Sequence, residues 1–361
     1  MSKKPIVSIY TFLFVIECAF SQTITTNPLK LEREDGSLIT YYLETRNSER
    51  HSKNLFVLFQ GSDYNSIRNN PVMDKMKAIL PNTDILTIEK YGITDVLPFS
   101  RNSRDSIPHE YLAFDNPNQR VADANTVVTS LMKNFNYEKI IVFGGSEGAD
   151  VAYLFSSKYK YVQVTITIGG GGRFFIDDVI HSIKCSNELS EEKKEANIEE
   201  VKQFYQYVLS HDSLDFNAGG HGFSYWKTMF SSDFQEIINN ISTPLLILQG
   251  GKDNSASPEK ATEMVQALKQ LGKNNIDYLF YPEYDHSLNL SFDDNDKSKE
   301  VGLRKFYADD KYKRLKDENL MSEIMTLAEF WRYVNAGIEP DEEINYSISI
   351  EARKYLLSCH S

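Results

Sequence analysis

Residues 139–149 read KIIVFGGSEGA and point to the architecture of the whole chain. The apolar run at 139–143 is typical of a strand buried in a parallel sheet, and a Gly-Gly-Ser-Glu-Gly segment follows it. A G-x-S-x-G sequence between a strand and a helix is typical of a nucleophile elbow. Its glycines let the strand and the helix pack closely, which holds the serine in a strained, exposed conformation. Ser146 is therefore the candidate nucleophile.

Short β-rich runs and helical patterns alternate on both sides of this stretch. Helical periodicity is present at 118–135, behind the start signal Asp-Asn-Pro at 115–117, and at 258–271. This alternation predicts an α/β protein with a doubly wound, mostly parallel sheet. The further predicted strands are 38–44, 54–59, 84–89, 162–168, 245–249 and 277–281.

The interval between the strands at 162–168 and 245–249 is too long for a simple connection. It holds a charged helical run at 188–209 and an aromatic stretch at 221–230. We therefore expect residues 173–241 to form an inserted helical cap over the carboxyl edge of the sheet. Tyr225 and Trp226 are its candidate substrate-binding residues, and the alternative is that these aromatic side chains pack the core of the cap itself. The remaining segments, 22–172 and 242–361, form the core domain, which ends in a helical tail that includes 318–334.

A serine nucleophile needs a base, and the base needs an orienting acid. Asp253 follows the strand at 245–249 in the sequence QGGKD, and His286 follows the next strand. Both residues are thus expected at the carboxyl edge of the sheet, where open α/β sheets assemble their sites. The alternatives for the acid are Asp177 and Asp178, which follow the preceding strand, and Asp285, whose adjacency to His286 disfavours the required geometry.

The oxyanion of a tetrahedral intermediate requires hydrogen-bond donors. The backbone N–H of Glu147, directly after the nucleophile, is one candidate. The second is expected in the turn Gln-Gly-Ser-Asp at 60–63, where Ser62 is the preferred donor and Asp63 is the alternative. Asp63 is also a candidate for contact with the substrate.

Two other stretches have competing interpretations. The glycines at 169–172 lack the Lys-Ser/Thr of a phosphate loop, so close packing of the backbone near the site is favoured. Arg101 and Arg104 are interpreted as solvated cations at the rim of the site, and the alternative is that they bind a substrate carboxylate.

The charge and residue usage limit the partners of this chain. The 361 residues carry a formal net charge of −12, which repels polyanions, so a nucleic-acid partner is not expected. The seven histidines and three cysteines show no metal-ligand spacing, and we expect neither a metal nor a cofactor. The expected partner is a small ester or acyl substrate, and the sequence does not indicate an oligomeric state.

The amino-terminal residues have the pattern of a signal peptide. Lys3 and Lys4 precede an apolar run, and Ala19-Phe20-Ser21 supplies small residues for cleavage before Gln22. A signal peptide at 1–21 predicts a periplasmic or secreted protein with no membrane span after its removal. An uncleaved anchor, and a lipoprotein with Cys18 as the lipid site, are the alternatives.

Removal of these residues leaves Cys185 and Cys359. In an oxidising compartment the two thiols could form one disulfide or stay unpaired, and the sequence favours neither outcome.

The elbow at 144–148, the G-x-x-D turn at 250–253 and the Asp-His-Ser loop at 285–287 together resemble the α/β-hydrolase superfamily, over about residues 38–290. Within it, the chain is similar to serine esterases and prolyl-oligopeptidase-like hydrolases with a G-x-S-E-G elbow. The resemblance implies an α/β-hydrolase fold and a serine hydrolase that cleaves a carboxylic ester through an acyl-enzyme. Two departures are Gln60, where His is common before Gly61, and Gly145, where His often precedes the nucleophile. A peptidase or amidase, and a catalytically silent binding protein of the same fold, are the alternatives.

Overall fold

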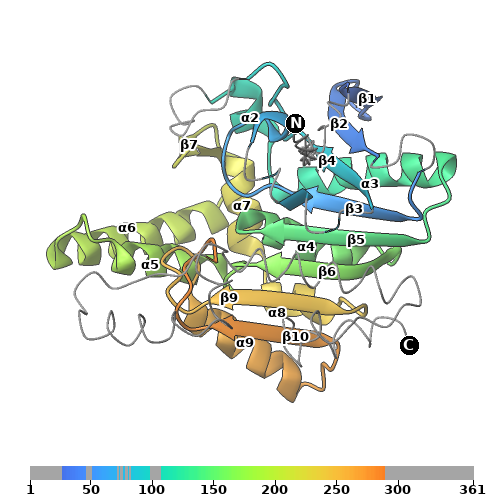
Figure 1. The fold of residues 1–361 in the computed structure, drawn as a ribbon. Helices are drawn as coiled ribbons and strands as arrows, with labels where there is room; N and C mark the ends of the chain where they lie inside the picture. Colours follow the sequence, from blue (N-terminus) through green and yellow to red (C-terminus); the bar gives the residue numbers. More distant parts are fainter. Residues whose placement is uncertain are drawn as a thin grey trace, which may run out of the picture.

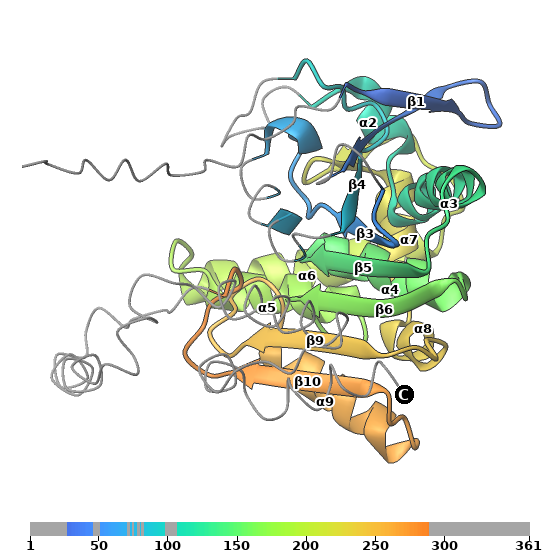
Figure 2. The same cartoon turned by 45° about the vertical axis from the view of Figure 1, so that its right-hand side comes forward.

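The computed structural model describes residues 27–45, 51–70, 73, 76, 77, 80, 83–97 and 107–288. Within them, a mostly parallel sheet runs through the molecule (Figures 1 and 2). Its strands are β1 Leu29–Glu32, β2 Leu38–Glu44, β3 Asn54–Phe59, β4 Asp84–Ile88, β5 Lys139–Gly145, β6 Val162–Ile168, β9 Leu245–Gly250 and β10 Ile276–Tyr281.

The strand order in this 8-stranded sheet is β1-β2-β4-β3-β5-β6-β9-β10. The strands from β4 to β10 in this order pair in parallel, whereas β1 and β2 are antiparallel at one edge. The carboxyl ends of β3, β5, β6 and β9 therefore meet at one edge of the sheet. The turns that follow these strands lie together there.

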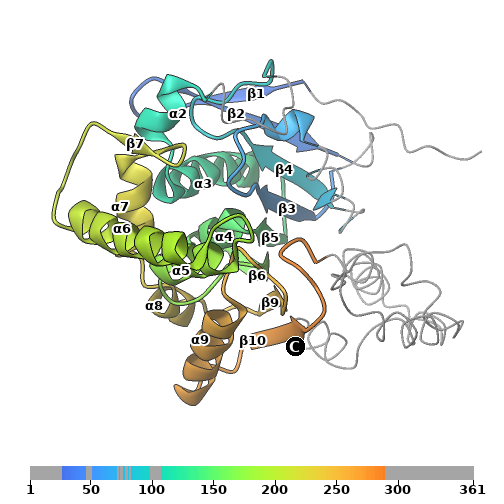
Figure 3. The same ribbon diagram turned by 90° about the vertical axis from the view of Figure 1, so that its left-hand side faces the viewer.

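Helices cover one face of the sheet, as Figure 3 shows for α3, α4, α8 and α9. The helix α3 begins as the sequence predicts, because Pro117 occupies its first turn and the Asn116 side chain accepts a hydrogen bond from Gln119 N at 3.1 Å. The helices are α2 His109–Phe114, α3 Pro117–Asn134, α4 Glu147–Lys158, α5 Phe175–Cys185, α6 Glu191–Leu209, α7 Phe223–Ser231, α8 Phe234–Asn239 and α9 Pro258–Gln270, with a 3₁₀ turn η1 Ile67–Asn69.

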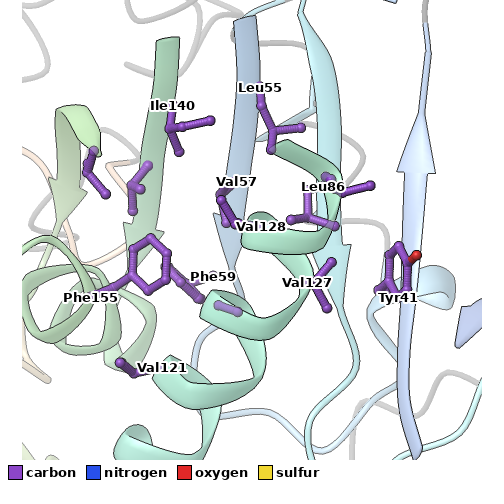
Figure 4. Close-up of a cluster of buried hydrophobic side chains, with 14 of the residues drawn as sticks. Tyr41, Leu55, Val57, Phe59, Leu86, Val121, Val127, Val128, Ile140 and Phe155 are labelled. Carbon is purple, nitrogen blue, oxygen red and sulfur yellow. The ribbon is translucent and has the colours of Figure 1, made fainter. Parts of the chain in front are cut away.

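Successive residues of the central strands face opposite hydrophobic layers. From β3, Leu55 and Val57 point toward α3 and α4, where they pack with Val128 (Figure 4). Phe56 and Leu58 point to the opposite layer. Because β3 is buried on both faces, its sequence is continuously apolar rather than alternating.

Residues 173–241 form α5 to α8 and the short hairpin of β7 Asn217–Ala218 and β8 His221–Gly222. The helices α5 and α6 lie beyond the carboxyl ends of the parallel strands (Figures 1 and 3). In contrast, α7 and α8 pack against α4 through Met229, Phe234 and Ile238, in a layer shared with Ala149 and Tyr153. The inserted segment thus contributes to the core as well as to the edge of the sheet.

The seven predicted strands are confirmed within two residues at each end, and so are the predicted helices at 118–135 and 258–271. The helical run predicted at 188–209 corresponds to α6, which begins at Glu191. The sequence missed β1, β7 and β8. Several predictions concern residues outside the described part of the chain: the signal peptide with Cys18, the pair Arg101 and Arg104, Cys359, and the tail with its helix at 318–334. Among the described helices, none has the length and hydrophobicity needed to cross a membrane.

Candidate active site

Ser146 lies at the turn between β5 and α4 and has φ 56° and ψ −132°. A positive φ is uncommon for a residue with a side chain and costs on the order of 1–3 kcal/mol, so the surrounding structure must hold it. The backbone N–H of Ser146 donates to the carbonyl of Ile168 at 2.8 Å, which ties the elbow to β6. The side chain is only half-buried. The strained elbow expected from the sequence is therefore present.

Two glycines of the motif are required by close contacts. A Cβ on Gly144 would lie 2.0 Å from the carbonyl oxygen of Gly148, and a Cβ on Gly148 would lie 2.3 Å from that of Phe59. A side chain at Gly144 would push α4 away from β5, and one at Gly148 would push α4 away from β3. The glycines therefore permit the packing that holds Ser146.

Asp253 and His286 come together as the sequence predicts. Nδ1 of His286 lies 2.8 Å from Oδ2 of Asp253, whose side chain is fully buried. The other carboxylate oxygen accepts the backbone N–H groups of Ser255 and Ala256 at 2.8 and 2.9 Å, and Gln249 Nε2 donates to Oδ2 at 3.0 Å. These donors fix the carboxylate in one orientation.

The hydrogen bond to Asp253 defines the protonation of the imidazole. An ionised carboxylate can only accept, so Nδ1 of His286 carries the proton and Nε2 of the neutral ring presents a lone pair. Burial by itself would lower the pKa of His286, but the hydrogen bond and the negative charge of Asp253 raise the pKa above its usual 6.5. The imidazole is thus arranged to take up a proton at Nε2.

Ile168 and Gly169 connect the elbow to this pair. The carbonyl of Ile168 accepts the N–H of Ser146, and a Cβ on the following Gly169 would lie 3.1 Å from Nδ1 of His286. Only a glycine with φ +58° allows the imidazole to approach so closely. Ser146 and His286 therefore lie on the two sides of one dipeptide. This contact confirms the interpretation of 169–172 as a closely packed backbone segment.

The alternative acids have other positions. Oδ1 of Asp178 accepts the backbone N–H of Ser257 at 2.7 Å and its Oδ2 accepts that of Gly172 at 3.2 Å. Burial raises the pKa of Asp178 to about 7. The Asp285 carboxylate accepts the N–H of Ser287 at 2.9 Å, and Asp177 is half-buried in the first turn of α5. His286 is paired with Asp253, and Asp178 instead joins α5 to the start of α9.

The turn at 60–63 lies beside the nucleophile. A Cβ on Gly61 would lie 3.5 Å from Cβ of Ser146, and Ser62 next to it is exposed. The Asp63 side chain accepts hydrogen bonds from Gln60 Nε2 at 2.8 Å, Asn65 N at 3.0 Å and Asn70 Nδ2 at 3.1 Å. The Asp63 carboxylate therefore stabilises the turn itself, and its contact with a substrate stays a prediction.

The two aromatic candidates of the inserted segment pack against other residues of the protein. Tyr225 is only 3% exposed and stacks on His221 with ring centroids 3.7 Å apart. Trp226 is half-buried, donates from Nε1 to the carbonyl of Ala218 at 2.9 Å and packs edge-to-face on Phe204. Trp226 thus packs within the helical segment, whereas Tyr225 joins the core layer that contains Ala149 and Tyr153 and hydrogen-bonds the Glu147 side chain.

The sequence did not reveal a cluster of buried charges behind the turn at 60–63. Lys90 follows β4 and Arg120 lies in α3, and both donate to Oε1 of Glu147, at 3.4 and 2.6 Å. Burial would raise the pKa of Glu147, but the charges of Lys90 and Arg120 outweigh it and hold the pKa at about 2. A charged residue directly after a buried strand was the only signal for Lys90.

No group of three or more His, Cys, Asp or Glu side chains is arranged to hold a metal ion within the described ranges.

Cys185 is exposed, and its Sγ lies 3.5 Å from Nε2 of His181. The same Nε2 contacts the carbonyl oxygen of Asp253 at 2.8 Å. Because Cys359 lies outside the described residues, the possible disulfide remains a prediction.

One protein-family model matches part of the sequence. A model of the C-terminal domain of BAAT and acyl-CoA thioester hydrolases matches residues 127–292, just under half of the chain. The match includes the elbow, Asp253 and His286. No curated protein matches the sequence.

Solved structures with a similar arrangement include several esterases. An esterase from Pyrococcus furiosus is 14% identical, with 78% of this chain and 88% of that chain covered and a TM-score of 0.49. Est1E from Butyrivibrio proteoclasticus, solved with ferulic acid, is 11% identical, with 78% and 98% covered and a TM-score of 0.46. A cold-adapted esterase from an Arctic intertidal metagenomic library is 13% identical, with 78% and 91% covered and a TM-score of 0.46.

The description of the matched family model includes acyl-CoA thioester hydrolases, which supports an enzyme with a small-molecule substrate. The strand order of the sheet and the strained serine between β5 and α4 agree with it. The chain has the α/β-hydrolase fold, and its residues 127–292 are similar to the C-terminal domain of acyl-CoA thioester hydrolases.

Proposed function

We propose that the protein is a serine hydrolase that cleaves a carboxylic ester through an acyl-enzyme. Ser146 is the nucleophile, His286 is the general base and acid, and Asp253 orients the imidazole. The backbone N–H groups of Glu147 and Ser62 bind the oxyanion. Neither a metal nor a cofactor takes part in these steps.

The reaction has two halves. Nε2 of His286 takes the proton of Ser146 Oγ while Oγ attacks the ester carbonyl, and the carbonyl oxygen becomes the oxyanion. When this intermediate collapses, the imidazolium returns the proton to the departing alkoxide, which leaves the acyl group on Ser146. Water then attacks the acyl group, His286 takes and returns a proton in the same way, and the acid is released with free Ser146.

The observation that carries this proposal is the Asp253–His286 pair beside a strained serine. The pair leaves Nε2 as the acceptor, and the backbone of Ile168 and Gly169 places the imidazole next to the elbow. A binding protein would gain nothing from a serine held at positive φ, because the strain reduces stability. The arrangement therefore favours catalysis over the silent alternative.

A thioester is the second candidate substrate, because the matched family includes acyl-CoA thioester hydrolases. The same acyl-enzyme would form, with a thiolate in place of the alkoxide as leaving group. An amide would require protonation of a much poorer leaving group, and we place a peptidase or amidase third. Comparison of oxygen esters, thioesters and amides with one common acyl group distinguishes these classes through kcat/KM.

The test of the proposal is the activity of Ser146→Ala on this substrate panel. We expect ester hydrolysis by the wild type and a loss of several orders of magnitude in the folded variant, about 10⁴-fold or more. The hydroxyl is half-buried and contributes little packing, so the melting temperature should stay close to that of the wild type. Substantial hydrolysis by folded Ser146→Ala would refute the assignment.

A further inference from the structure

We propose that Lys90 and Arg120, held by Glu147, are positioning residues that fix the oxyanion turn at 60–63 against the nucleophile elbow. This inference rests on the proposed function and adds to it the groups that orient the second oxyanion donor. The three side chains are almost fully buried, with exposed fractions of 1% for Lys90, 7% for Arg120 and 3% for Glu147.

Both cations bind backbone carbonyls of the turn. Lys90 Nζ donates to the carbonyl oxygens of Gly61 at 2.6 Å and Asp63 at 2.9 Å. Arg120 Nη2 donates to that of Gln60 at 2.5 Å. Three carbonyls of one short turn are therefore directed toward two buried positive charges. Such charge-assisted hydrogen bonds are about twice as strong as neutral ones.

Because the peptide bond is planar, the contact of Lys90 with the Gly61 carbonyl fixes the direction of the Ser62 N–H. No peptide bond in the described residues is cis, and in a trans peptide the C=O and N–H groups point to opposite sides. With the Gly61 carbonyl on Lys90, the Ser62 N–H must point away from the cation. Gly61 borders the elbow, since its Cβ would lie 3.5 Å from that of Ser146. The donor of the turn is thus held beside the nucleophile.

The same contacts favour Ser62 over Asp63 as the oxyanion donor. The N–H of Asp63 belongs to the peptide whose carbonyl is that of Ser62. Within the described part of the chain, neither Lys90 nor Arg120 donates to this carbonyl. A cation on a carbonyl also polarises its peptide, which strengthens the N–H as a donor. Of the two candidate donors, Ser62 and Asp63, only the Ser62 N–H gains both effects.

Glu147 connects this support to the nucleophile. Its backbone N–H is the other candidate donor, directly after Ser146, and its carboxylate binds both cations. One residue therefore ties the two donors of the oxyanion hole together. Breaking the contact of Lys90 should disturb the turn while leaving the Asp253–His286 pair intact.

The test is Lys90→Met, with Lys77→Met as the matched control. Lys77 is also a buried lysine, and it is paired with a glutamate, Glu44, at 2.5 Å in another part of the chain. We expect Lys90→Met to lower kcat about 10–100-fold with KM within about threefold, because the oxyanion forms only after substrate has bound. Lys77→Met should change kcat less than about threefold.

Hydrogen–deuterium exchange provides a measurement that does not depend on activity. Peptides that cover residues 60–70 should exchange faster in Lys90→Met than in the wild type or in Lys77→Met, because the turn loses its cation. If Lys90→Met does not fold, Arg120→Lys replaces it. This variant keeps the charge and removes donors, so we expect a fall in kcat of about 3–10-fold and faster exchange of the same peptides.

Unchanged kcat and unchanged exchange in folded Lys90→Met would overturn the inference, and so would equal losses in Lys77→Met. An inactive wild type that shows no acylation of Ser146 would instead refute the proposed function. In that case, faster exchange of residues 60–70 in Lys90→Met would still show that Lys90 holds the turn. Unchanged exchange would refute the role of Lys90 in addition to the proposed function.

Discussion

The two sides of the candidate site are held by different kinds of interaction. On the acid–base side, neutral donors from the backbone and from Gln249 orient the Asp253 carboxylate. On the oxyanion side, the buried charges of Lys90, Arg120 and Glu147 hold the turn at 60–63. On the acid–base side, polar groups therefore surround one carboxylate. On the oxyanion side, several charged side chains bind one another and the carbonyl groups of the turn.

Because of this difference, we expect the two sides to control different properties of the reaction. The donors around Asp253 fix its orientation, and its hydrogen bond and charge raise the pKa of His286. The charges of Lys90 and Arg120 instead bind the carbonyl oxygens of the turn at 60–63. Variants of the acid–base side should therefore change the pH dependence of the reaction. Variants of the oxyanion side should lower the rate at every pH.

The largest effect in this comparison is expected for Asp253→Asn. The amide cannot accept from Nδ1 of His286 and the two N–H groups of Ser255 and Ala256 in the way the carboxylate does, so the ring loses its productive tautomer. Turnover should fall by up to about 10⁴-fold, measured as kcat on the best ester of the panel.

Asp178→Asn is the matched control, because Asp178 is another buried carboxylate that accepts backbone N–H groups near the site. Its turnover should stay within about tenfold of the wild type, and Asp177→Asn should change it even less. If Asp178→Asn lost more activity than Asp253→Asn, the assignment of the orienting acid would be wrong.

The pH profile shows the next largest effect. His286 acts as a base only when it is neutral, so kcat/KM should fall about tenfold per pH unit as the pH falls below its raised pKa. The midpoint of this limb should lie above 6.5 in the wild type. Asp253→Asn should move it to lower pH, whereas Lys90→Met should lower the plateau without moving the midpoint.

Asp178, with a pKa of about 7, also titrates in this range. If the acidic limb of the pH profile stays in place in Asp178→Asn, it belongs to His286, and if it disappears, it belongs to Asp178.

The free energy of unfolding also depends on the titration of His286. Because the pKa of His286 is raised in the folded state, its contribution to stability is present below pH 6.5 and is lost as the pH rises through the folded-state pKa.

The smallest effect on chemistry is expected for Trp226→Ala in the inserted segment. Trp226 packs against Phe204 and Phe230, so its removal should destabilise the protein by about 2–4 kcal/mol, measured by denaturant unfolding. Acylation of Ser146 by a small probe should stay within about threefold. A shift in acyl-chain preference at unchanged stability would instead support a lid that contacts the substrate.

The sequence predicts the parallel strands well because strands buried on both faces are continuously apolar, as β3 is. It does not reveal β1, which lies at the edge of the sheet with mostly exposed side chains and no apolar run. Ser146, Asp253 and His286 are predictable for a related reason: each follows a strand of the sheet, and parallel strands end at one edge.

The charges behind the oxyanion turn are not predictable in this way. Arg120 and Glu147 are 27 positions apart and Lys90 and Glu147 are 57 apart, on different elements with no shared motif. The role of Tyr225 cannot be predicted from the sequence for another reason. An aromatic residue that packs a helix into the core has the same sequence pattern as one that lines a pocket, and only the contacts distinguish the two.

The central claim is that Ser146 forms a covalent acyl intermediate, and mass spectrometry of the protein treated with a fluorophosphonate tests it most directly. We expect one adduct per chain, located on the peptide that contains Ser146. Labelling should be slowed strongly in His286→Ala, because the base no longer removes the hydroxyl proton. Ester hydrolysis by a protein whose Ser146 stays unmodified, or an adduct on another residue with Ser146 free, would contradict the claim.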